Sequence, residues 1–72
     1  MAKIYFISET AAPRLQRGVP GGVLIVTQQC DVLAEALGRA MKGDRLLLVE
    51  LVSVTQPQSV WVNPHTVSAV TD

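Results

Sequence analysis

The chain has little of what small proteins use to reinforce a fold. Its 72 residues include one cysteine, Cys30, and one histidine, His65. A lone cysteine excludes an intrachain disulfide, and one thiolate with one imidazole falls short of the four ligands of a structural zinc site. A domain this short buries only about 60% of the surface that its unfolded chain exposes. We therefore expect no metal and no cofactor, and we expect self-association to supply the missing stability.

Net charge and aromatic residues are also scarce. Six basic residues balance six acidic ones, and the aromatic residues are one Trp, one Tyr and one Phe. Balanced charge removes the electrostatic field with which proteins collect nucleic acid or acidic membranes. The apolar runs are too short for a bilayer span or a signal-peptide core, so we expect a cytoplasmic protein. Because 49% of residues are hydrophobic and so few of these are aromatic, the core must be largely aliphatic.

The pattern of apolar residues predicts a single domain over residues 1–72 with an α+β fold. β-Branched and aliphatic runs predict strands at 3–8, 23–27, 45–54 and 60–63, and a helical period covers 31–43. The segment 23–54 has the length of a crossover between parallel strands. We therefore expect a small mixed β-sheet of about four strands with one amphipathic helix on one face, in the order β-β-α-β-β.

The helical segment has clear boundaries. Asp31 is a good N-cap residue, and Gly43 suits the left-handed position that ends a helix. Its apolar arc includes Leu33, Leu37 and Met41, which predicts that these side chains pack on the sheet.

The segment 45–54 is apolar on both faces, which predicts a contact with another chain. One face carries Leu46, Leu48 and Val52, and the other carries Leu47, Val49 and Leu51. A single helix covers only one side of a sheet, so the second face should meet another copy of the chain. Trp61 alternates with Val60 and Val62 and would serve as an aromatic anchor. The expected interface residues are Leu46, Leu48, Val52 and Trp61.

The stretch VWVNPHTVSAV, residues 60–70, indicates a sharp corner. Proline cannot donate to a strand ladder, and an Asn side chain can accept from the backbone two residues later. Asn63 and Pro64 should therefore end the strand and aim Val67 and Val70 at the core, with 66–70 forming a helical turn or a short last strand. This stretch resembles a local feature of small flagellar proteins of the FlbD type over about ten residues.

Three functions follow from these residues, and the first is preferred. It is a small non-enzymatic homo-oligomeric interaction or regulatory module, of the kind found in phages and mobile elements. The second is an oligomeric protein that binds single-stranded nucleic acid with Arg14, Arg17 and Tyr5. Whatever the function, the loop 9–22 is expected to be either free or an arm exchanged between copies. The third is an enzyme whose site at a subunit interface uses His65, Glu50 or Cys30, although no spacing supplies a nucleophile with its base.

Overall fold

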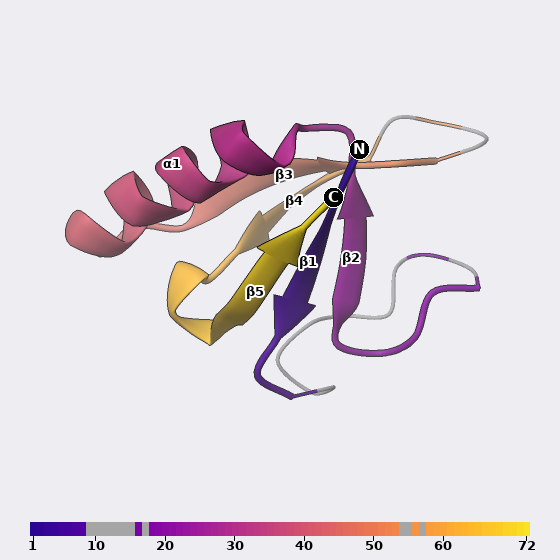
Figure 1. Ribbon diagram of the computed structural model, residues 1–72, viewed down its shortest axis with the longest axis horizontal. Coiled ribbons are helices and arrows are strands. Elements are labelled where there is room, and N and C mark those ends of the chain that lie inside the picture. The colour runs from indigo at the N-terminus through magenta and orange to yellow at the C-terminus, as the bar shows by residue number, and fades with distance from the viewer. Residues whose placement is uncertain (9–15, 17, 54–55, 57) are drawn as a thin grey trace.

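The computed structural model describes residues 1–8, 16, 18–53, 56 and 58–72, and in them it confirms the α+β class. Five strands and one helix follow one another along the chain, and a 3₁₀ turn, η2, joins the last two strands (Figure 1). Their bounds are β1 (Ala2–Phe6), β2 (Val23–Val26), α1 (Cys30–Lys42), β3 (Leu47–Leu51), β4 (Gln58–Val62), η2 (Pro64–Thr66) and β5 (Val67–Thr71).

The strands form one antiparallel sheet in the order β4-β3-β2-β1-β5, so the expected mixed sheet with a parallel crossover is wrong. The reason is the direction of α1. The helix continues away from the end of β2 instead of folding back over it, and β3 then returns beneath the helix (Figure 1). The chain reverses after the helix, between residues 43 and 46, which makes β3 antiparallel to β2.

The sheet must curl strongly, because its two edge strands are consecutive in sequence. Only residues 63–66 connect β4 to β5. Crossing a flat five-stranded sheet takes about 19 Å, from four strand spacings. The five steps from Val62 to Val67 reach about 17 Å even when fully extended, and the 3₁₀ turn shortens them further. The curl therefore draws the two edges toward each other around the core.

The helix starts and ends differently from the prediction. It begins at Cys30 with Gln29 as its N-cap residue, and no side chain makes a capping hydrogen bond there. Asp31 therefore lies in the first turn and is not the cap. At the other end Gly43 has φ −92°, and the left-handed residue is Asp44, with φ 54°. Aspartate is one of the few residues with a side chain that enter this conformation readily.

One apolar cluster fills the inside of the curled sheet. The helix contributes Leu33, Leu37 and Ala40 to the buried residues, which confirms most of its predicted face. Met41 remains 47% exposed, because the apolar arc is wider than the contact that the sheet makes with it. The strand residues of the cluster are Ala2, Ile4, Phe6, Leu24, Val26, Val49, Leu51 and Val62.

The corner at Asn63 forms as predicted. The Asn63 side chain accepts a hydrogen bond from the backbone N–H of His65 (3.0 Å), and Pro64 is fully buried. Val67 and Val70 are partly buried against the core cluster. Of the two alternatives for residues 66–70, the short last strand occurs as β5, and the 3₁₀ turn η2 precedes it.

Candidate interaction surface

The side of the sheet away from α1 and the core, called here the outer face, carries an exposed apolar pair. β3 and β4 pair along their whole length, and Leu48 lies directly opposite Trp61. Their neighbours in register, Val49 and Val60, point toward the core. Leu48 is 45% exposed and Trp61 is 62% exposed. Side chains of directly opposed residues lie close enough to touch, so these two form one continuous apolar surface.

Leu46 extends this surface. It precedes β3 and is 55% exposed, while its neighbour Leu47 packs against the core cluster. Continuing the alternation of β3 back by one residue places Leu46 on the same side as Leu48. We call Leu46, Leu48 and Trp61 the hairpin patch. Single exposed apolar residues are ordinary on a protein surface, whereas adjacent ones are typical of contact sites.

The structure also decides which face of the 45–54 segment is open. Val49 and Leu51 are in the core, so the face with Leu46 and Leu48 is the exposed one. Val52 had been predicted to join the same interface. It is only partly exposed and lies at the far end of β3, where its N–H donates to Ile25 C=O (3.0 Å). Val52 therefore stands apart from the hairpin patch.

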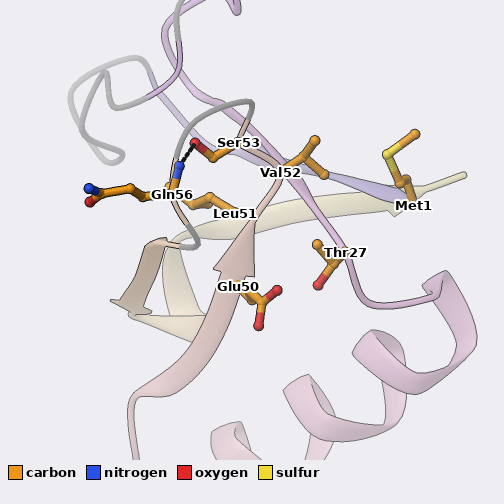
Figure 2. A pocket seen from close by; sticks show the side chains of 7 residues that line it. All are labelled: Met1, Thr27, Glu50, Leu51, Val52, Ser53 and Gln56. Atoms are coloured by element: carbon orange, nitrogen blue, oxygen red, sulfur yellow. Dashed lines mark hydrogen bonds between the residues drawn. The ribbon is translucent and has the colours of Figure 1, made fainter.

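A shallow hollow surrounds Val52 at that end (Figure 2). Glu50 is the one ionisable side chain among the residues that line it, so the hollow offers no pair of carboxylates for acid–base chemistry. A hydrogen bond from the backbone N–H of Gln56 to Ser53 Oγ (3.3 Å) closes one side. The lining residues are Met1, Thr27, Glu50, Leu51, Val52, Ser53 and Gln56.

Two glutamine side chains supply hydrogen bonds between β2 and β3, and no sequence pattern predicts them. Gln16 lies in the segment that was expected to be a loop. Its Oε1 accepts from Ile25 N–H (2.8 Å), and its Nε2 donates to the carbonyls of Ile25 (2.7 Å) and Val52 (3.0 Å). Beyond the C-terminal end of β2, Gln28 Oε1 accepts from Glu50 N–H in β3 (3.3 Å). The amides thus replace strand residues where the two backbones diverge.

The residues considered for catalysis do not come together. Cys30 opens α1, and its thiol donates to Val70 C=O (3.6 Å). His65 lies beyond the other end of the helix, where its Nε2 is 3.0 Å from Asp44 Oδ1. A helix of 13 residues is about 20 Å long. Glu50 is exposed on the outer face, in register with Ser59. The three side chains therefore occupy separate regions.

Of the residues predicted to bind nucleic acid, only Tyr5 lies in the part of the chain that the structure describes. Tyr5 is half-buried on β1, in register with Val23 and Ala69. Arg14 and Arg17 lie outside the described residues, as does most of the 9–22 loop. Lys3 shares the outer face with Tyr5, two residues away along β1.

No protein-family model matches the chain, and comparison with curated proteins and with solved structures finds no match. In the part of the chain that the structure describes, no helix has the length and apolar character needed to cross a membrane. A functional conclusion therefore rests on the chain's own residues.

Proposed function

We propose that the protein is a small homo-oligomeric interaction module that contacts copies of itself through the hairpin patch. It acts without a catalytic site or cofactor, as an accessory or regulatory component in the cytoplasm. The observation that carries this proposal is the exposed Leu48–Trp61 pair on the outer face. The balanced charge of the chain supports it further, because copies approach each other without net repulsion.

The energetics favour self-association. Burying one large apolar side chain contributes about 1.5–3 kcal/mol. The hairpin patch holds Leu46, Leu48 and Trp61, and a two-fold axis doubles that contribution. Association costs several kcal/mol or more in lost translation and rotation, so the patch is sufficient if the surfaces fit closely. Trp61 has the size and exposure of an interface anchor.

The test is the solution mass of wild type and two lysine variants, measured by light scattering at micromolar concentration. We expect wild type at a multiple of the 7.7 kDa chain and Leu48→Lys at the mass of one chain, because a buried, unpaired ammonium is costly. Met41→Lys is the matched control, since Met41 is 47% exposed on α1 and Leu48 is 45% exposed. A monomeric wild type, or a Leu48→Lys variant that keeps the assembled mass, would contradict the proposal.

Binding of single-stranded nucleic acid is the alternative outcome. In this function Trp61 and Tyr5 stack on bases, and Lys3 lies on the same face as Tyr5. The negative charge of Glu50 on that face offsets the positive charge of Lys3. Titration with a generic oligonucleotide at two salt concentrations separates the two functions. Salt-dependent binding by the wild type, lost in an Arg14→Ala and Arg17→Ala double variant, would replace the interaction module with an oligomeric nucleic-acid-binding function.

A further inference from the structure

The two edges of the sheet differ in how they are covered. β5 lies beside α1: the Cys30 thiol donates to Val70 C=O, and Ala34, Leu37 and Met41 line a hollow together with β5 residues. β4 pairs with β3 on one side and has no strand on its other side among the described residues. Covering an edge with a helix is one of the ways in which proteins prevent edge-to-edge pairing, and in the part of the chain that the structure describes β5 is the edge that has this protection.

The hydrogen bonds of β3 show which backbone groups the β4 edge presents. Glu50 C=O accepts from Thr27 N–H (2.9 Å), and Glu50 N–H donates to Gln28, so both groups of Glu50 point toward β2. Backbone groups alternate along a strand, so those of Val49 and Leu51 point toward β4. The backbone groups of their register partners, Val60 and Gln58, point toward β3. The N–H and C=O groups of Ser59 and Trp61 therefore face away from the sheet.

The composition of this edge does nothing to block pairing. The β4 sequence is QSVWV, which contains no charged residue, no proline and no glycine. Charges and prolines are the residues by which edge strands usually resist another strand. No described residue pairs with the outward N–H and C=O groups of Ser59 and Trp61, so they are open to a partner strand, beside the exposed Trp61 side chain.

Resting on the self-association proposed above, we propose that β4 of one copy pairs antiparallel with β4 of a second copy, about a two-fold axis at Val60. This register places Ser59 opposite the partner's Trp61, and Trp61 opposite the partner's Ser59. Each of these pairs exchanges both of its backbone hydrogen bonds, so every outward group of Ser59 and Trp61 gains a partner. The two sheets then continue into one across the axis.

A second copy suits this edge better than a charged partner. The two-fold axis brings the two β4 strands side by side with Val60 opposite its own copy, and this strand has no charge to repel its copy. The two Trp61 side chains become diagonal neighbours on the outer face, within reach of each other. The half-buried Val60 side chains meet on the core side of the axis. The hairpin patches of the two copies thus become continuous.

The test is Ser59→Pro, with Ser59→Ala as its control. Proline removes the outward Ser59 N–H and leaves the β3–β4 hydrogen bonds intact, whereas alanine keeps that N–H. We expect Ser59→Pro to have the mass of one chain with an unchanged far-UV circular dichroism spectrum, and Ser59→Ala to keep the wild-type mass. If Leu48→Lys is monomeric but Ser59→Pro keeps the assembled mass, edge pairing is wrong and the proposed function stands. If Ser59→Pro is monomeric but Leu48→Lys keeps that mass, the edge pairs without the hairpin patch and the proposed function fails. If both variants keep that mass, both proposals fail.

Amide hydrogen exchange on the wild-type protein covers the case in which Ser59→Pro does not fold. We expect the Ser59 and Trp61 amides to exchange more slowly as protein concentration rises, because only the paired form protects them. The Val60 amide already faces β3 and serves as the internal reference. Fast, concentration-independent exchange at Ser59 and Trp61 in an assembled protein would overturn edge pairing.

Discussion

At the scale of single residues, Gln16 has an unusual structural role for a side chain outside the sheet. Its amide connects β2 with β3 by accepting from Ile25 N–H and donating to two carbonyls. Val52 N–H already donates to Ile25 C=O, whereas Ile25 N–H and Val52 C=O have the Gln16 amide as their partner. An unsatisfied buried group costs more than a hydrogen bond gains, so the amide matters chiefly because its absence leaves these two backbone groups unpartnered.

We expect Gln16→Ala to lower the free energy of unfolding by about 1–3 kcal/mol, the penalty for leaving buried polar groups unpaired. Urea denaturation measures this difference. Gln56→Ala is the control, because Gln56 is exposed and its side chain makes none of the hydrogen bonds described here. Equal stability of the Gln16→Ala and Gln56→Ala variants would show that water replaces the Gln16 amide without cost.

At the scale of elements, the end of α1 determines where β3 can begin. Asp44 adopts a left-handed conformation directly after the helix, and Arg45 N–H returns to Ala40 C=O (2.9 Å). The chain reverses over these residues and enters β3 beneath the helix (Figure 1). The Asp44 carboxylate also meets His65, which joins the helix end to η2. Both side chains are largely exposed to solvent, so the contribution of this contact to stability is small.

We expect Asp44→Ala to be less stable than Asp44→Gly by about 1 kcal/mol. Both variants lose the contact with His65, but glycine enters the left-handed region without a steric penalty and alanine does not. Thermal or urea unfolding of the two variants gives the difference directly. If alanine proved as stable as glycine, φ at position 44 would have to relax and the helix would end by another geometry.

At the scale of the whole molecule, a short connection and a curled sheet divide the apolar residues into two sets. Because β4 and β5 are joined by four residues, the sheet closes around one core and leaves its outer face to solvent. Most of the strand residues on the helix side are buried, whereas Leu48 and Trp61 remain exposed on the other side. A chain this small gains little further stability from its own core. A contact between copies therefore adds a substantial fraction of the total free energy of unfolding.

The proposed assembly predicts a melting temperature that depends on protein concentration. Association stabilises the folded state by mass action, so the Tm of wild type should rise across a hundredfold increase in concentration. Leu48→Lys should show no such dependence, because it remains monomeric throughout. Differential scanning calorimetry at two concentrations checks both. A wild-type Tm that is independent of concentration would argue against self-association in this range.

The local patterns of the sequence were sufficient for four of the five strands, for the helix and for the corner, whereas the last strand, β5, was one of two alternatives. The first strand, expected at 3–8 and found at Ala2–Phe6, the helix with Leu33 and Leu37 inward, and the turn at Asn63 all follow from these patterns. Each depends on neighbours a few residues apart: alternation along a strand, the 3.6-residue helical period, and an Asn side chain that reaches two residues ahead. The exposure of Trp61 beside its buried neighbour Val62 followed from the same alternation.

Tertiary structure decided the features that depend on residues far apart in the sequence. The antiparallel direction of β3 depends on where the chain reverses after α1, and strand–helix–strand length alone does not reveal it. Both faces of 45–54 are apolar, so only the curl of the sheet selected Leu48 as exposed and Val49 as buried. Gln16 meets Val52 only because β2 and β3 diverge there. Such contacts form between surfaces brought together by the whole fold, which no local period encodes.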